Sequence, residues 1–231
     1  MKLVNITMNI FKITKIKIVS LALVAIVFML GGASLAGAAT CTNTLTAPTS
    51  PSASCTTTIS AAISPVVSIK TSGAGTVPLA VTPSTAGLQS WASDDVTVAT
   101  NDTTVSGFSL TLSSSTAQVT LNSGSNTIAA SAGTFALPAA LVANSWGYCV
   151  ISVGGFATNC PATAQANQTI SSTYKFAAIP ASGSASTIAN PTGPQDYGTP
   201  VVTTIWYSVA ANTATKSGSY TDILVYTATV I

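Results

Sequence analysis

The chain contains no histidine, arginine or glutamate, and charged residues make up only 5% of its 231 residues. General acid–base chemistry near neutral pH relies mainly on histidine or on carboxylates with shifted pKa values. Phosphate-binding sites favour the bidentate arginine side chain. Metal sites are also disfavoured, because the sequence has no histidine and no two cysteines at CxxC spacing. We therefore expect a non-enzymatic protein with no catalytic residues, no metal ion and no cofactor.

The formal charge of +2 arises from the first seventeen residues, which hold four of the seven lysines. The rest of the chain has three lysines against five aspartates, a net charge of −2. Nucleic-acid-binding surfaces are strongly positive, so the composition excludes a nucleic-acid partner. The three later lysines, Lys70, Lys175 and Lys216, are also the only candidates for a serine–lysine dyad, and no motif surrounds them.

Residues 1–39 have the layout of a secretory signal helix. A basic segment precedes an apolar run, Ile18–Leu30, and small residues follow. Residues 36–38 fit the A-x-A cleavage pattern, which predicts removal of this segment after residue 38 or 39. Two alternatives stay open: the run is long enough for an uncleaved membrane anchor, and Cys41 is placed for lipidation. The expected location is extracellular, at the cell surface, with membrane contact only through an uncleaved signal segment.

Four cysteines, Cys41, Cys55, Cys149 and Cys160, follow the signal segment. Exported proteins tend to oxidise their thiols, so disulfides are expected, and four cysteines allow three connectivities. We favour Cys41 with Cys55 and Cys149 with Cys160, because each pair is close in sequence and flanks a turn-rich segment. The second pair is predicted to lie across a hairpin formed by residues 146–153 and 156–160.

Short strands separated by turn residues dominate the chain after a Thr/Ser/Pro arm at residues 40–55. Gly107–Ser113 alternates apolar and hydroxyl side chains, which is typical of a strand with one wet face. Val96–Thr100 is expected to start a separate strand after Asp94 and Asp95. Together these patterns predict an all-β fold, an antiparallel β-sandwich of Ig-like or pilin-like type over residues 56–231. Two smaller sandwiches that share the last sheet are an open alternative.

The C-terminal segment carries the strongest strand pattern. Val201–Ala210 and Tyr220–Ile231 are rich in β-branched and aromatic residues and are joined by a polar connection, which predicts a β-hairpin. Alternation places Ile223 and Val225 on one face and Leu224 on the other. Neither face is polar, so both are expected to be covered, within a sandwich or by a neighbouring subunit.

Three residues are candidates for contact with sugars. Trp91 has small and acidic neighbours, which favours an exposed ring that could stack on a glycan, although packing in the core is the alternative for any tryptophan. Asn101 and Asn167 each begin an N-linked glycosylation sequon in a predicted surface turn.

Several segments carry a family resemblance. Val96–Asn101, Gly107–Leu112, Asn144–Tyr148 and Gly218–Asp222 resemble secreted surface proteins of bacteria of the candidate phyla radiation. The start of the last strand is also similar to the C-terminal ends of spore-coat-U and pilin-like sandwiches. The first resemblance implies a cell-surface location, and the second implies that the last strand lies in an assembly groove.

These observations favour a structural subunit of an extracellular filament or surface layer that assembles through β-strand contacts with its own copies or with other surface proteins. The donor segment is expected within Thr56–Lys70. The predicted assembly residues are Ile63, Val66, Val67, Ile69, Ile223 and Val225. The alternative is a monomeric adhesin or carbohydrate-binding module with glycans as partners.

Overall fold

The computed structural model describes residues 59–73, 75–102, 107–151, 153–191 and 196–231. The chain divides into two compact units, Met1–Ile63 and Ser64–Ile231. Of the first unit only residues 59–63 are described; they are exposed and belong to no helix or strand. The predicted signal helix, the arm and the first residues of the predicted domain, together residues 1–58, lie outside the described part.

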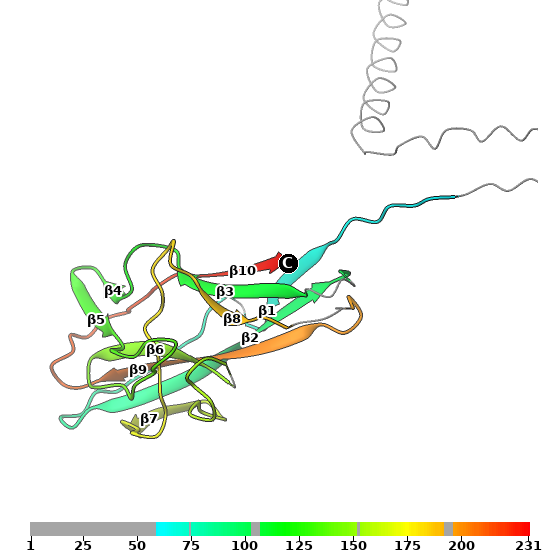
Figure 1. Ribbon diagram of the computed structural model, residues 1–231. Coiled ribbons are helices and arrows are strands. Elements are labelled where there is room, and N and C mark those ends of the chain that lie inside the picture. The colour runs from blue at the N-terminus through cyan, green and yellow to red at the C-terminus, as the bar shows by residue number, and fades with distance from the viewer. Residues whose placement is uncertain (1–58, 74, 103–106, 152, 192–195) are drawn as a thin grey trace, which may run out of the picture. The chain divides into compact units, whose positions relative to one another are not determined.

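The described part of the second unit is all-β and contains ten strands and no helix (Figure 1). The strands are β1 (Val67–Thr71), β2 (Leu88–Thr100), β3 (Phe108–Ser114), β4 (Leu121–Ser123), β5 (Asn126–Ala130), β6 (Ser145–Val150), β7 (Gln165–Thr169), β8 (Ser186–Ala189), β9 (Val201–Ala211) and β10 (Leu224–Val230). None of the described residues belongs to a helix long and apolar enough to cross a membrane.

The strands form two sheets. The larger has the order β1-β2-β9-β6-β5-β4, with β7 also paired to β2, and the smaller has the order β10-β3-β8. All pairs are antiparallel except β5 with β6, which run parallel through Ala129–Ser145 and Ala130–Trp146. The predicted all-β class is confirmed, while the expectation of a purely antiparallel fold misses this one pair.

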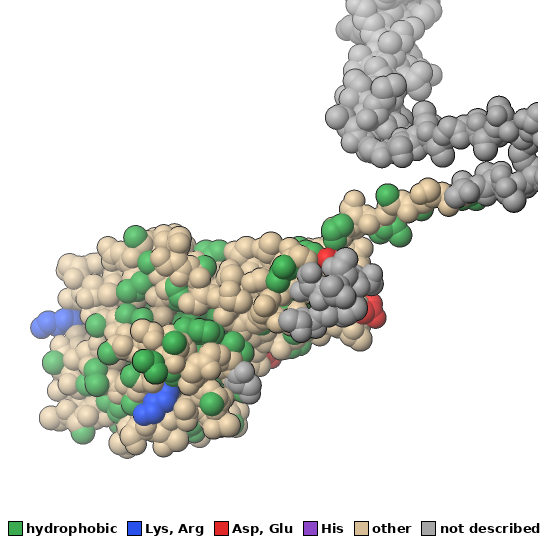
Figure 2. All heavy atoms as spheres, in the orientation of Figure 1, with side chains coloured by type: hydrophobic (Ala, Val, Ile, Leu, Met, Phe, Trp, Pro, Cys, Tyr) green, Lys and Arg blue, Asp and Glu red, His purple; other side chains and the backbone are tan. Residues whose placement is uncertain are grey.

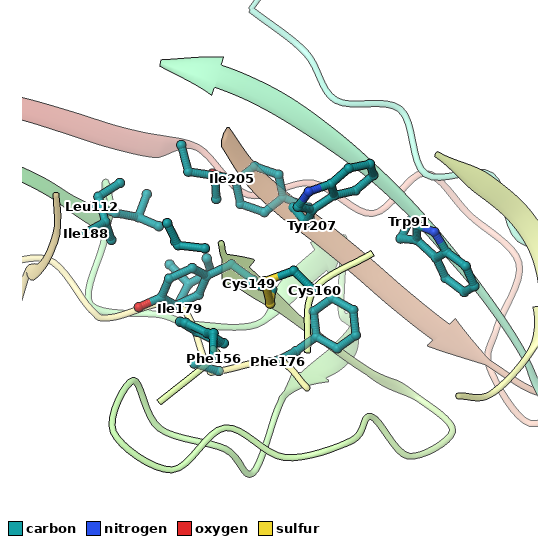
Figure 3. Packing of buried hydrophobic residues seen from close by; sticks show 14 of the residues in the cluster. Trp91, Leu112, Cys149, Phe156, Cys160, Phe176, Ile179, Ile188, Ile205 and Tyr207 are labelled. Carbon is teal, nitrogen blue, oxygen red and sulfur yellow. A yellow bond between two sulfur atoms is a disulfide. The ribbon is translucent and has the colours of Figure 1, made fainter. Parts of the chain in front are cut away.

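Both sheets contribute to one cluster of buried apolar residues. Phe108, Leu110 and Leu112 of β3 are fully buried and belong to the same cluster as Ile205 of β9 and Tyr148 of β6. Figure 3 shows the part of this cluster around Ile205, Tyr207 and the Cys149–Cys160 disulfide. Burial of this apolar area supplies the main force that holds the two sheets together.

The alternation read from Gly107–Ser113 is confirmed in β3, where buried and half-buried residues alternate along the whole strand. The expected break before Val96 is wrong, because β2 runs without interruption from Leu88 through both aspartates to Thr100. Asp94 is buried inside this strand because its Oδ1 accepts hydrogen bonds from the Ser72 backbone N–H at 3.1 Å, the Ser72 hydroxyl at 2.9 Å and the Gly73 N–H at 3.3 Å. A carboxylate with three donors tolerates burial that an unpaired one would not.

The predicted C-terminal hairpin is wrong, although both of its strands exist. β9 lies between β2 and β6 in the larger sheet, whereas β10 pairs only with β3 in the smaller one, through matches such as Tyr226 with Leu112. The connection between the two strands is long enough to cross from one sheet to the other. Strand periodicity identifies a strand and its faces, but it carries no information about which strand is its partner.

The second predicted hairpin is also wrong. β6 ends at Val150, and residues 156–160 form turns and loop rather than a returning strand. The strand-like partner on that side of β6 comes from further along the chain, where Ala177 bridges Tyr148 through hydrogen bonds of 2.9 and 2.8 Å. Cys149 and Cys160 nevertheless form a disulfide, with Cα atoms 5.6 Å apart, in agreement with the pairing favoured from the sequence. Cys41 and Cys55 lie outside the described residues.

Candidate functional site

The last strand, β10, is an edge of the smaller sheet. It pairs with β3 on one side, and no strand pairs with its other side in the part of the chain that the structure describes. Its seven residues, Leu224–Val230, include neither a charged residue nor a proline. Charges, prolines and short length are the usual devices that keep an edge strand from pairing with another chain.

The hydrogen-bond pattern shows which backbone groups of β10 are free. Ser115 N–H donates to Ile223 O at 2.7 Å, and Ile231 N–H donates to Gly107 O at 3.2 Å. In an antiparallel pair, hydrogen-bonded residues alternate with residues whose N–H and C=O point away from the partner. Residues 225, 227 and 229 therefore bond to β3, and the N–H and C=O groups of residues 224, 226, 228 and 230 point outward from the free edge.

The side chains of β10 alternate between the core and solvent. Leu224, Tyr226 and Ala228 pack against the core cluster, whereas Val225 is 41% exposed and Ile223, just before the strand, is 70% exposed. The expectation that both faces are covered is therefore not met by the described residues. The exposed face of β10 therefore consists of Val225, Thr227 and Thr229, which are neutral side chains that a second strand could pack beside.

The other edge strands are protected or short. β1, the edge of the larger sheet, carries Lys70 and follows Pro65. β4 and β8 have three and four residues, and β7 is interrupted by an irregular register against β2 and by Asn167, whose φ is 56°. Among the described strands, β10 is thus the longest edge strand that has no charged residue, no proline and no irregularity in its pairing.

Two polar contacts anchor β10, and sequence reasoning missed both. Asp222 Oδ1 accepts hydrogen bonds from the Ser114 hydroxyl at 3.0 Å and from the Ile223 N–H at 2.8 Å, which fixes the start of the strand against the end of β3. Partial burial raises the pKa of the Asp222 carboxyl, and these two hydrogen bonds oppose the shift. The signal available in the sequence was an aspartate directly before an apolar strand.

The second anchor joins the two sheets. The hydroxyl groups of Tyr207 in β9 and Tyr226 in β10 share a hydrogen bond. Burial raises the pKa of Tyr226 to about 12 and that of Tyr207 well above its usual value, because the charged phenolate would lose its hydration. The pair therefore stays protonated at physiological pH and holds β10 against the larger sheet, whose edge strand β1 also lies close to β10 without pairing with it.

The predicted assembly residues are all exposed in the structure. Exposed fractions range from 36% to 85% for Ile63, Val66, Val67, Ile69, Ile223 and Val225. Their backbones differ, however. Val67 and Ile69 already belong to β1 and pair with Thr100 and Val98 of β2.

The side chain of Asn101, the residue after β2, makes two hydrogen bonds to the backbone just before β1, one on each side of Pro65. Its Oδ1 accepts a hydrogen bond from the Val66 N–H at 2.5 Å, and its Nδ2 donates to Ser64 O at 3.4 Å. The predicted donor segment Thr56–Lys70 is therefore partly committed within its own chain, and residues 59–63 are the described portion outside these contacts.

The predicted sugar contact at Trp91 is wrong. The ring is only 5% exposed, its Nε1 donates a hydrogen bond to Thr163 O at 2.8 Å, and Tyr174 meets it edge-to-face at 5.2 Å. The segment around residues 163–174 covers the ring through these two contacts. The small and acidic neighbours in the sequence belong to strand β2, in which Ser93 is exposed while Trp91 and Asp94 are buried. Trp146 and Trp206 are buried as well.

The two sequons differ in their surroundings. Asn101 follows β2 and uses its amide to hold the backbone before β1. Asn167 lies in strand β7 rather than in a turn, and its Oδ1 accepts a hydrogen bond from the Thr82 N–H at 2.6 Å. Glycosylation at either asparagine stays a prediction.

The described residues contain no group of three potential metal ligands, and Figure 2 shows a face made mostly of hydrophobic and neutral polar atoms, with isolated lysine and aspartate side chains. A comparison of the chain with protein-family models, curated proteins and solved structures found no match. The function must therefore be argued from the edge strand and its chemistry.

Proposed function

We propose that this protein is a non-enzymatic structural protein of the cell surface, exported by its N-terminal segment, and that copies of it assemble by adding a strand to the free edge of β10. The observation that carries the proposal is the edge itself: four residues of β10 present outward N–H and C=O groups, and no charge or proline guards them. On this proposal the two sheets form a sandwich that is used in a pilin-like manner.

The added strand needs an extended, neutral segment with apolar side chains on one face. Residues 59–63 of another copy meet this requirement, because Ile59, Ala61 and Ile63 fall on one face of an extended chain. Ile59 and Ile63 are 91% and 85% exposed. Backbone hydrogen bonds would supply affinity, and burial of the two isoleucines would add about 1.5–3 kcal/mol for each.

The low charge of the chain also favours pairing of residues 59–63 with β10 of another copy. Neither residues 59–63 nor β10 contains a charged side chain, so no like-charge repulsion opposes their pairing. A net charge close to zero also promotes association between copies.

The test removes one outward N–H group of β10. Ala228→Pro deletes an outward donor and places the proline ring on the free edge, while the hydrogen bonds to β3 come from residues 227 and 229 and are kept. The matched control is Ala228→Ser, which changes the same side chain but keeps the outward N–H group of residue 228.

We expect exported wild-type protein and Ala228→Ser to form large species in light scattering and micrographs, and Ala228→Pro to remain monomeric. Far-UV circular dichroism verifies that each variant is folded. Assembly of folded Ala228→Pro at the wild-type level, or a wild-type protein that stays monomeric at high concentration, would refute the proposal.

A further inference from the structure

A polar cleft of about 260 Å³ lies at the start of β5, where the turn from β4 meets the loop between β9 and β10, and none of its lining residues belongs to β10. Six of its lining residues carry the argument: Asn126, Thr127, Asn144, Thr215, Lys216 and Tyr220. This volume is below the roughly 300–1,000 Å³ of sites that enclose drug-sized ligands, so the cleft suits one small polar unit whose remainder stays in solvent.

Asn144 organises the floor of the cleft. It adopts a left-handed backbone conformation, with φ 64°, directly before β6. Its Oδ1 accepts hydrogen bonds from the Asn212 N–H at 3.3 Å and from the Thr215 hydroxyl, and its backbone O accepts one from the Ala129 N–H at 3.2 Å. One strained asparagine thus ties β5, β6 and the loop after β9 together, and a non-glycine residue in this conformation is kept only where its surroundings require it.

The wall of the cleft is fixed in a similar way. The Tyr220 hydroxyl donates to Lys216 O at 2.8 Å, which closes the segment between them into a compact loop. A Cβ atom at Gly218 would lie 2.6 Å from Ser123 Oγ, so this loop packs closely on the turn between β4 and β5. These contacts hold the loop that forms one side of the cleft against the end of β4.

The chemistry of the lining selects a negatively charged ligand. No carboxylate lines the cleft, and Lys216 is its only charged side chain. With Asn144 Oδ1 already engaged, the Nδ2 group of this amide is the part left with free donors. The Asn126 amide and the Thr127 hydroxyl add further polar groups, and the Tyr220 ring provides an apolar surface of the kind on which a sugar ring packs.

We propose that this cleft binds a saccharide unit that carries a carboxylate, with Lys216 facing the carboxylate and the amides and hydroxyl groups facing the sugar hydroxyls. Phosphate is disfavoured, because sites for that dianion rely on arginine or on several convergent donors with charge, and this chain has a single lysine here and no arginine at all. The inference does not depend on strand-mediated assembly.

The test uses exported, folded protein and an oligosaccharide of galacturonic acid, titrated by NMR, with the corresponding neutral galactose oligosaccharide as the comparison ligand. We expect weak binding of the acidic ligand, with a Kd of about 1 mM, and an affinity for the neutral ligand lower by about tenfold or more. Chemical-shift changes are expected at Asn144 and Lys216. Inorganic phosphate, titrated in parallel, should cause no saturable change at these residues.

Lys216→Met is expected to reduce affinity for the acidic ligand about tenfold, which is the usual effect of losing one charged contact. Lys175→Met is the matched control, since Lys175 donates to Ser172 O at 2.7 Å and does not line the cleft. Asn144→Gly keeps the left-handed backbone while it deletes the amide, and should also weaken binding.

Four results would each overturn the proposal. They are equal affinity for the acidic and neutral ligands, undiminished binding by Lys216→Met, saturable phosphate binding, and no binding at all. Ala228→Pro should bind as wild type does, so failure of this site is distinguishable from failure of assembly.

Discussion

Removal of the Cys149–Cys160 disulfide gives a stability change that can be worked out from the structure. The bond closes a loop with a sequence separation of 11 residues. In the chain-entropy model, a loop of this size stabilises the folded state by about 3 kcal/mol, because it restricts the unfolded chain. Both cysteines are buried, so the double variant Cys149→Ala, Cys160→Ala avoids placing new polar groups in the core.

The measurement is urea unfolding of the wild type and of the double variant, followed by tryptophan fluorescence. Taking a denaturant dependence of about 2 kcal/mol per molar urea, the midpoint should fall by about 1.5 M. Wild-type protein unfolded in the presence of a reductant should follow the variant, which separates the crosslink from the effect of the alanines. A variant whose midpoint shifts by less than about 0.3 M would refute the loop-entropy reasoning for this site.

Two further predictions concern the buried tyrosines. Tyr226→Phe removes the hydroxyl bonded to Tyr207 and leaves a buried phenol without that partner; thermal or urea unfolding should show a loss of about 1–3 kcal/mol, and unchanged stability would contradict the role of this pair in joining the sheets. Wild-type stability should be constant between about pH 8 and pH 10 and fall as the pH rises further, because burial raises the pKa of Tyr148 to about 12 while an unfolded tyrosine ionises near pH ~10. Urea midpoints measured from pH 8 to pH 11.5 check this, and a flat profile would show that these phenols are exposed.

Local patterns in the sequence were sufficient for the class of the fold and for several of its strands. β3 was predicted because Phe108, Leu110 and Leu112 are separated by hydroxyl residues, and a period of two has a direct structural meaning. The disulfide was predicted because short separation and export favour that pairing, and it did not depend on the strand arrangement assumed for it.

Which strands pair with one another could not be predicted from local patterns in the same way. β9 and β10 are consecutive and both rich in β-branched residues, yet one lies at the centre of the larger sheet and the other at the edge of the smaller. The sheet that each strand joins depends on contacts between residues far apart in the sequence, such as the Tyr207–Tyr226 and Asp222–Ser114 hydrogen bonds. A pattern read over a few neighbouring residues does not contain these contacts. Trp91 was misjudged for a related reason, since the segment that covers it lies some seventy residues away in the sequence.

The candidate sites likewise include one part that the sequence predicted and one that it did not. Alternation correctly placed Ile223 and Val225 on the face opposite Leu224, but that face was expected to be covered and both side chains are exposed. The polar cleft was not, because its residues come from three separate stretches of chain and none forms a recognisable motif. Asn144 gives only a weak hint in the sequence, as asparagine is one of the few residues that tolerates a left-handed conformation.

The two proposals reinforce each other through the short segment that joins them. Tyr220 lines the cleft and Leu224 begins β10, with Asp222 fixed between them by its bond to Ser114. Copies assembled through β10 would therefore present their clefts at regular intervals, each held close to the assembly strand. A single cleft with millimolar affinity would bind a glycan only briefly, but a row of such clefts on a polymeric ligand gains avidity by a factor of about 100 or more without any new contact. Weak binding by the monomer is thus the affinity expected of a surface protein that works as an array, because adhesion then depends on assembly.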